Sequence, residues 1–81
     1  MVKENLPDIV VEALKTNAGS ATIVEVSRYI WNNYETELRK SGDLFYTWQY
    51  DARWAATQLR KSGIMKTKEI SPRGVWELSK I

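Results

Sequence analysis

The sequence predicts a small α+β domain in which three helices precede a C-terminal β-hairpin. Apolar residues recur at helical spacing in three segments, and asparagine or glycine follows each of them. After Gly63 the pattern changes to two short apolar runs on either side of a turn sequence at 71–74. The length of 81 residues corresponds to one domain, so we expect a single domain over 1–81 with the hairpin at about 64–78.

The first helix is expected to begin at Pro7 and to end around Thr16. Proline is tolerated in the first turn of a helix because its missing N–H would have no partner there anyway. One face of this helix is apolar, because apolar residues recur every three or four positions: Leu6, Ile9, Val10, Ala13 and Leu14. A breaker at 17–20 separates the helix from a brief extended segment at 21–22.

A capping box predicts where the second helix begins. The Thr22 hydroxyl and the Glu25 carboxylate can each accept from a free backbone N–H in the first turn. The buried stripe comprises Ile23, Val26 and Ile30, with Tyr34 as a further member if the helix continues that far. Two alternatives remain open for its length: one helix that runs to 39–40, or a helix that pauses around 32–33.

The third helix is predicted at 47–61. Thr47 is a suitable N-cap, Asp51 lies near the positive end of the helix dipole, and Gly63 supplies the left-handed residue that follows the helix. One face is apolar and carries Trp48, Ala52, Trp54, Ala55 and Leu59. The opposite face carries Gln49, Arg53, Ala56, Thr57 and Arg60, and it contains no acid.

Positive charge is concentrated in the second half of the chain. Residues 1–40 hold five basic and six acidic groups, net −1, whereas residues 41–81 hold seven basic and four acidic groups, net +3. Between Arg53 and Trp76 only Glu69 is acidic, and six residues are basic: Arg53, Arg60, Lys61, Lys66, Lys68 and Arg73. A localised basic surface of this kind is typical of proteins that bind nucleic acids.

The predicted order of elements is that of a winged helix-turn-helix, with the second and third helices as the helix-turn-helix pair and the hairpin as the wing. The chain resembles the N-terminal winged-helix domain of Mrr-type restriction proteins in three pieces: Trp54-Ala55, Leu59-Arg60-Lys61-Ser62-Gly63-Ile64 and Arg73-Gly74-Val75-Trp76-Glu77-Leu78. The HARE-type winged helix of chromatin and restriction proteins is a looser match. In the Mrr-type family this domain commonly precedes a nuclease domain, and we expect any such chemistry to lie outside these 81 residues.

These features predict a non-catalytic module that binds double-stranded DNA, with helix 47–61 in the major groove and the wing over the backbone. Nine residues are candidates for DNA contact: Thr47, Gln49, Arg53, Thr57, Arg60, Lys61, Lys66, Lys68 and Arg73. Gln49 and Arg53 lie in the first half of the helix and can reach base edges, although a merely solvated face is the alternative. The later residues are expected to meet phosphate, and Arg73 at the wing tip can also enter a minor groove.

Large aromatic residues motivate a function of another class. One small core does not readily bury all of them, so exposed members would mediate protein–protein contact: Trp31, Tyr34, Tyr46 and Trp48. Trp54 and Trp76 are expected in the core, together with Leu44 and Phe45 from the connection before the third helix. A homodimer is compatible with DNA binding if it presents two recognition helices about one DNA turn apart.

The composition argues against catalysis. The chain has no His and no Cys, which excludes a His-based triad and a His or thiolate metal site. No Gly-rich phosphate loop is present, and no Asp or Glu is followed two residues later by Lys, as in restriction-type nuclease sites. We therefore expect no enzyme activity, cofactor, metal or small-molecule substrate. No apolar run approaches about 18 residues and no signal peptide begins the chain, so we expect a cytoplasmic protein without membrane contact.

Overall fold

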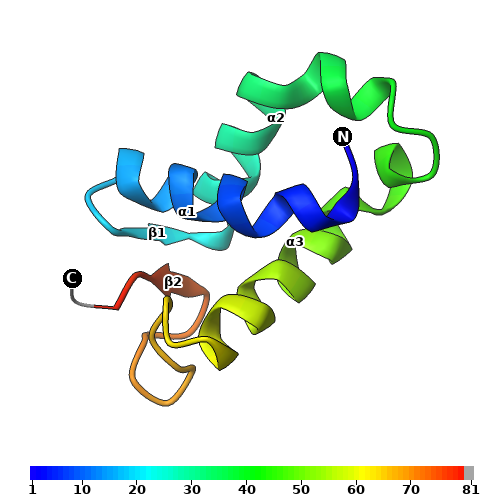
Figure 1. Ribbon diagram of the computed structural model, residues 1–81. Coiled ribbons are helices and arrows are strands. Elements are labelled where there is room, and N and C mark those ends of the chain that lie inside the picture. Colours follow the sequence, from blue (N-terminus) through cyan, green and yellow to red (C-terminus); the bar gives the residue numbers. More distant parts are fainter. Residues whose placement is uncertain (80–81) are drawn as a thin grey trace.

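The computed structural model describes residues 1–79, which form three α-helices and a two-stranded antiparallel sheet (Figure 1). In chain order the elements are the short 3₁₀ helix η1 (Lys3–Asn5), α1 (Leu6–Thr16), β1 (Ser20–Thr22), α2 (Ile23–Arg39), α3 (Leu44–Lys61) and β2 (Val75–Glu77). The predicted α+β class is confirmed. The predicted domain end at Ile81 lies outside the described residues.

α1 begins and ends where the apolar pattern indicates. Pro7 occupies its first turn, as predicted. At its C-terminus the N–H of Gly19 donates to the carbonyl of Leu14 (2.7 Å), and the N–H of Ala18 donates to the carbonyl of Lys15 (3.3 Å). This pair of hydrogen bonds is the Schellman motif, which requires a left-handed residue after the helix. Ala18 fills that position with φ = 60°, a conformation that favours glycine.

The predicted capping box begins α2. The N–H of Thr22 donates to the Glu25 carboxylate (2.8 Å), and the N–H of Glu25 donates to the Thr22 hydroxyl (3.1 Å). The backbone hydrogen bond from Thr22, followed by that of its side chain, lowers the pKa of Glu25. α2 runs to Arg39 without ending at 32–33, but Tyr34 has non-helical angles (φ −129°, ψ 15°) that kink the helix there.

α3 begins at Leu44, earlier than the predicted Thr47. The turn at 41–43 starts the helix without a side-chain cap, because the N–H groups of residues 44–46 donate to the carbonyls three positions back. Leu44 is buried, and so is Trp48 one turn later. Burial of this apolar pair therefore determines where the helix starts, in place of a hydroxyl cap.

Thr47 is consequently an internal residue of α3, and its prediction as N-cap is wrong. Its hydroxyl donates to Oδ2 of Asp51 (2.7 Å). Asp51 lies about two turns into the helix and is buried, so its predicted position near the helix start is also wrong. The Thr47 hydroxyl satisfies a carboxylate oxygen that would otherwise be costly to bury.

The C-terminus of α3 follows the prediction. The N–H of Gly63 donates to the carbonyl of Arg60 (3.1 Å), and the N–H of Ile64 donates to the carbonyl of Leu59 (2.9 Å). Gly63 has φ = 81°, as the left-handed position of a Schellman motif requires. The chain therefore reverses at Gly63 and returns toward the sheet.

The strand pairing differs from the predicted hairpin. β2 pairs with β1, in the register Ser20↔Glu77, Ala21↔Trp76 and Thr22↔Val75. Residues 64–66 also pair with 77–79. Besides the antiparallel bridge Met65↔Leu78, the N–H of Lys66 donates to the Glu77 carbonyl (2.9 Å) and the N–H of Ser79 donates to the Ile64 carbonyl (2.8 Å). The predicted hairpin at about 64–78 is therefore present only as this short pairing, and the chain between its two sides forms two successive tight turns. Ile70 N–H donates to the Thr67 carbonyl and Val75 N–H donates to the Pro72 carbonyl, each at 3.1 Å.

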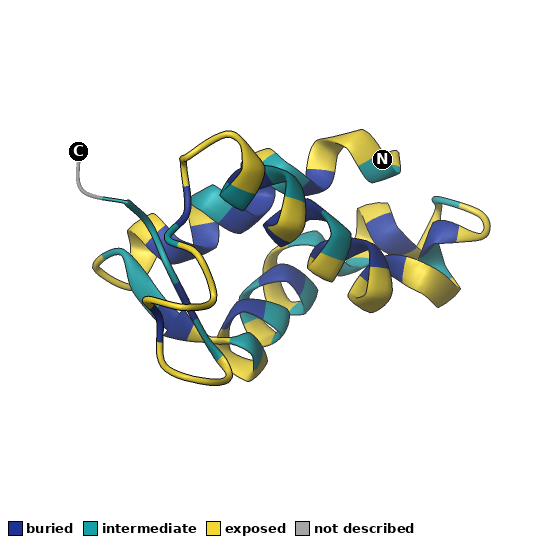
Figure 2. Cartoon of the chain, turned by 90° about the horizontal axis from the view of Figure 1, so that it is seen from below, coloured by how far each residue is buried: buried dark blue, intermediate teal, exposed yellow. Residues whose placement is uncertain are grey.

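One apolar core lies between the helices and the sheet, and Figure 2 shows its buried positions on the inner faces of the helices. Its members are Leu6, Ile9, Val10, Ala13, Leu14, Ala21, Val26, Ile30, Leu38, Leu44, Trp48, Ala52, Ala55, Ala56, Leu59, Met65 and Trp76. Trp76 is in the core as predicted, whereas Trp54 is only half-buried, with Lys3 Nζ 4.2 Å from its ring centroid. Ala56 was predicted on the polar face but is buried, because it continues the stripe of Ala52 one turn later.

Candidate nucleic-acid interface

The outer face of α3 is polar and aromatic. Residues at helical spacing are exposed along it: Tyr46, Gln49, Tyr50, Arg53, Thr57 and Lys61. Tyr46 and Tyr50 are the most prominent, since 82% and 76% of their surface is accessible. No acidic side chain lies on this face, because Asp51 points to the buried side of the helix.

A cleft of about 330 Å³ lies between this helix and the loop before β2. Its lining comes from the start of α2, the second half of α3, the loop and β2: Ile23, Arg53, Thr57, Arg60, Lys68, Ser71, Pro72, Arg73, Gly74, Val75 and Trp76. Four of these residues are basic and none is acidic. We call this the basic cleft.

Five of the nine predicted DNA-contacting residues line the basic cleft: Arg53, Thr57, Arg60, Lys68 and Arg73. α3 supplies the first three at intervals of four and three residues, which bring them onto one side of the helix. Arg60 is half-buried, and its Nε donates to the Lys66 carbonyl (3.3 Å). This hydrogen bond ties the end of α3 to the start of the loop.

The loop at 67–74 is held at both ends. The N–H of Ser71 donates to the Thr67 carbonyl (3.1 Å), and the carbonyl of Gly74 accepts from the N–H of Ile23 (3.1 Å). Gly74 has φ = 77° and lies with Arg73 at the centre of a turn that the Val75 N–H closes onto the Pro72 carbonyl, one residue later than the predicted turn at 71–74. Figure 1 shows this loop projecting below β2, beside the end of α3.

The Ser71 hydroxyl is a buried polar group of this region that lacks a hydrogen-bond partner. It is 8% exposed, and its Oγ has no hydrogen-bond partner within residues 1–79. Buried hydroxyls nearly always have a partner, so a single unpaired one in a basic cleft is informative. The sequence carried no signal for it, because the residue was assigned only to a turn.

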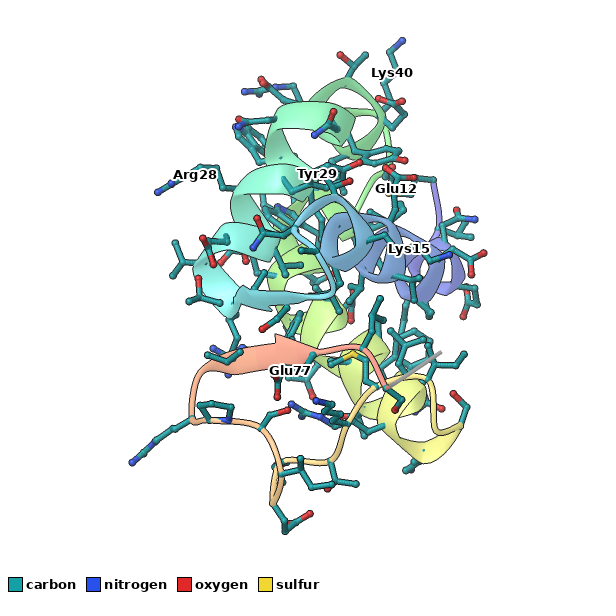
Figure 3. All side chains as sticks on the ribbon, turned by 90° about the vertical axis from the view of Figure 1, so that its left-hand side faces the viewer. Glu12, Lys15, Arg28, Tyr29, Lys40 and Glu77 are labelled. Carbon is teal, nitrogen blue, oxygen red and sulfur yellow. The ribbon has the colours of Figure 1, made fainter. Side chains whose placement is uncertain are left out.

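The other four predicted residues do not line the basic cleft. Gln49 borders an adjoining hollow that it shares with Arg53. Lys61 is exposed at the end of α3, and the hydroxyl of Thr47 is engaged by Asp51. Lys66 borders a different hollow together with Lys15 and Glu77, both labelled in Figure 3, so an acid partly offsets its charge.

Tyr50 is an exposed residue of α3 that is not among the nine predicted DNA-contacting residues. It lies between Tyr46 and Arg53 on the exposed face of α3. The spacing of residues along the helix could have identified Tyr50 as exposed. Once α3 starts at Leu44, the exposed line passes through 46, 50, 53 and 57.

The predicted set of exposed aromatics is mostly engaged within the fold. Trp31 and Trp48 stack with ring centroids 6.1 Å apart, and Trp48 is buried. Arg39 lies over Trp31, with Cζ 5.3 Å from the ring centroid. Of the four aromatics predicted to be exposed, only Tyr46 is fully so.

Tyr34 and Tyr29 instead bind one carboxylate at the crossing of α1 and α2 (Figure 3). The Tyr34 hydroxyl donates to Glu12, 2.9 Å from each carboxylate oxygen, and the Tyr29 hydroxyl donates to Oε2 at 2.5 Å. These bonds favour the neutral phenols. Hydrogen bonding to Glu12, and then desolvation, raises the pKa of Tyr34 to about 12. The hydrogen bond from Tyr29 to Glu12 likewise raises the pKa of Tyr29.

A scan against protein-family models, a search of curated proteins and a search of solved structures each found no match. Within residues 1–79 no helix has both the length and the apolar character needed to cross a bilayer. The same residues contain no group of three or more acidic side chains arranged to hold a metal ion.

Proposed function

We propose that this chain is a winged helix-turn-helix module that binds double-stranded DNA without catalysis. In this proposal α2 and α3 are the helix-turn-helix pair and the segment 64–78 is the wing. The antiparallel pairing of β1 with β2 supports the assignment, because it fastens the segment after α3 to the start of α2. The resemblance of residues 54–78 to the Mrr-type N-terminal domain supports it further.

The basic cleft is the observation that carries the proposal. Two arginines from α3, Arg53 and Arg60, and two basic residues from the loop, Lys68 and Arg73, line one cleft without an acid. Each is paired with no carboxylate within 4.0 Å in the part of the chain that the structure describes, where the one ion pair is Arg39–Glu35. Unpaired cations gathered on one side of a small domain attract a polyanion.

The exposed face of α3 adds the means to read bases. Gln49 and Tyr50 lie in its first half and Arg53 just past its middle, and Arg53 forms no ion pair within the described residues. Arg pairs bidentately with guanine and Gln with adenine in a major groove. In this arrangement Gln49, Tyr50 and Arg53 contact base edges, while Thr57, Lys61 and the loop contact phosphate.

A titration of fluorescent duplex DNA at several salt concentrations tests the proposal. With about five phosphate contacts, log K falls with log salt at a slope of roughly −4 to −5. Lys40→Ala is a matched control, because Lys40 is exposed at the far end of α2 from the loop (Figure 3). Absence of binding at low salt would contradict the proposal, as would an equal loss of affinity in the control.

A second candidate is a protein-interaction module, favoured by the exposure of Tyr46 and Tyr50 on α3 and of Val24 on α2, which is 64% accessible. Exposed tyrosines are typical of protein interfaces because they combine an apolar ring with a polar end. Sedimentation equilibrium distinguishes this function in its self-associating form. A dimer that dissociates on Tyr50→Ala supports it, and a strict monomer at high concentration rules out self-association.

A further inference from the structure

We propose that the basic cleft is a phosphate-binding site that receives one phosphate group of the duplex backbone. This inference rests on the proposed function, since it names the part of the DNA that the cleft takes. It goes further in assigning a role to Ser71, a neutral residue inside the cleft. The ligand chemistry is a phosphate group, and the source to which we commit is the phosphodiester of double-stranded DNA.

Charge is the first argument for this site. Arg53 and Arg60 reach the cleft from α3, and Lys68 and Arg73 reach it from the loop. Like charges around one cleft repel each other, and an anion between them removes that repulsion while it gains charge-assisted hydrogen bonds. The acids nearest in sequence do not neutralise these cations. Glu69 is exposed and does not line the cleft, and Glu77 borders the hollow that contains Lys66.

Ser71 is the second argument, and it is independent of charge. Other serine hydroxyls near helix ends are engaged: Ser62 donates to the Leu59 carbonyl (3.1 Å), and Ser41 donates to the Glu37 carbonyl. Ser71 Oγ has no such partner, although the residue lines the cleft and is more than nine-tenths buried. Its hydroxyl turns on a single χ1 angle, so we infer that a phosphate oxygen in the cleft becomes its acceptor.

The size of the cleft fits a phosphate with its attached sugar better than a bare ion. Its volume of about 330 Å³ far exceeds the roughly 10–15 Å³ that a single water molecule needs by the same measure. Pro72, Gly74 and Val75 form an apolar part of the wall, which suits a sugar ring. Arg53 belongs both to the cleft and to the exposed face of α3. A phosphate bound in the cleft therefore places the neighbouring groove of the DNA against the exposed face of α3 to which Arg53 belongs.

Inorganic phosphate is the first probe, added to the whole chain at constant ionic strength and followed by heteronuclear NMR. We expect shifts at the backbone amides of 67–71 and 73–75 and at the Nε–H groups of Arg53 and Arg60. The amides around Lys15 and Lys40 should not move, since neither residue lines the cleft. Shifts that are absent, or spread over all basic residues alike, would overturn the site.

Two substitutions then connect the site to DNA. Lys68→Ala should weaken duplex binding roughly three- to tenfold and make the salt slope shallower by about one contact, because a cation is lost. Ser71→Ala should weaken binding roughly three- to tenfold with the salt slope unchanged, because the hydroxyl is neutral. The thermal midpoint of the free Ser71→Ala protein should not fall, since the hydroxyl has no partner to lose. The controls are Lys40→Ala and Ser41→Ala, both at the far end of α2.

The two proposals fail in different ways. If the wild type binds duplex DNA with the expected salt slope and both substitutions behave like their controls, the phosphate site is wrong while DNA binding stands. If phosphate shifts gather at 67–75 but no duplex binds at low salt, the proposed function fails, and the backbone phosphodiester is overturned as the source. A lowered midpoint for Ser71→Ala with unchanged affinity would show a purely structural hydroxyl and contradict its role.

Discussion

At the crossing of α1 and α2 a carboxylate is surrounded by donors, whereas in the basic cleft several cations face no acid. Glu12 accepts from Tyr29 and Tyr34, and further along α2 the Arg39 guanidinium binds the Glu35 carboxylate at 2.8 Å. The basic cleft holds four cations and a buried hydroxyl without a partner. Both regions are built on the same core, so packing alone does not explain the difference.

The comparison separates polar groups that hold the fold from polar groups that remain available for a ligand. A carboxylate that accepts from two phenols contributes to the α1–α2 contact and has little left for another molecule. Cations without a carboxylate partner and an unpaired hydroxyl weaken the isolated domain slightly through repulsion and desolvation, although Arg60 also donates to the Lys66 carbonyl. Substitutions in the first region should therefore change stability, and those in the second should change binding.

Trp76→Ala is expected to have the largest effect, because Trp76 belongs to both the core and the wall of the basic cleft. Truncating this side chain, which is 4% exposed, should lower the free energy of unfolding by about 3–5 kcal/mol. Trp54→Ala should cost about 1–2 kcal/mol, since only part of that ring is buried. Urea unfolding followed by circular dichroism measures both. If Trp76→Ala lowered the free energy of unfolding no more than Trp54→Ala, Trp76 would not belong to the core and the core would not extend under the cleft.

Arg53→Ala and Arg73→Ala should change binding and leave folding nearly unaltered, because both side chains are exposed. Arg53→Ala should remove about 1–3 kcal/mol of discrimination at one base pair. Arg73→Ala should weaken all duplexes alike and make the salt slope shallower by about one contact. Competition titrations with a panel of duplexes measure both effects. If the two variants bind as the wild type does, this surface does not hold DNA and the protein-interaction function becomes the better proposal.

The sequence predicted helices better than strand partners, for a physical reason. Helix termini are fixed by residues within a few positions, such as the capping box at Thr22 and Glu25 and the left-handed Gly63. The partner of β2 lies more than 50 residues earlier in β1, and nothing local distinguishes it from the segment at 64–65. The predicted start of α3 at Thr47, a good capping residue, is too late because burial of Leu44 in the core extends the helix toward its N-terminus.

The candidate site shows the same division. Arg53, Arg60, Lys68 and Arg73 were predicted from charge and spacing, and the fold brings them to one cleft. Lys66 has the same chemistry and lies elsewhere, because its N–H pairs with the Glu77 carbonyl (2.9 Å) before the turn that begins at Thr67. Ser71 could not be predicted, since whether a buried hydroxyl finds a partner depends on groups that only the tertiary structure brings near it.

The C-termini of α1 and α3 provide a smaller test of the comparison. Both end in a Schellman motif, but α1 uses Ala18 (φ 60°) where α3 uses Gly63 (φ 81°). Ala18→Gly should stabilise the protein by about 0.5–1 kcal/mol, because glycine adopts this conformation without a Cβ penalty. Gly63→Ala should destabilise it by about 1–2 kcal/mol, although nothing lies within 4 Å of the added Cβ. Thermal unfolding of the pair should give shifts of opposite sign, and shifts of the same sign would refute this account.

Tyr34→Phe removes a hydrogen bond to Glu12 at neutral pH and also changes how stability depends on pH in the alkaline range. Hydrogen bonding to Glu12, and then desolvation, raises the pKa of the Tyr34 phenol from 10.0 to about 12. The unfolded chain therefore loses this proton before the folded chain does. The resulting stabilisation is fully present below pH 10 and is lost as the pH rises to about 12. In Tyr34→Phe the free energy of unfolding should fall less steeply across that interval.

Urea unfolding between about pH 9 and 12 measures this slope. The measured quantity is the difference in this slope between wild type and variant. Tyr50→Phe is the matched control, because its hydroxyl is on the exposed face of α3 and far from Glu12 in the chain. Glu12→Gln should flatten the slope further than Tyr34→Phe, since Glu12 raises the pKa of Tyr29 as well. If Tyr50→Phe and Tyr34→Phe have the same slope, the Glu12 cluster does not hold α1 to α2, and the contrast with the basic cleft fails at its structural end.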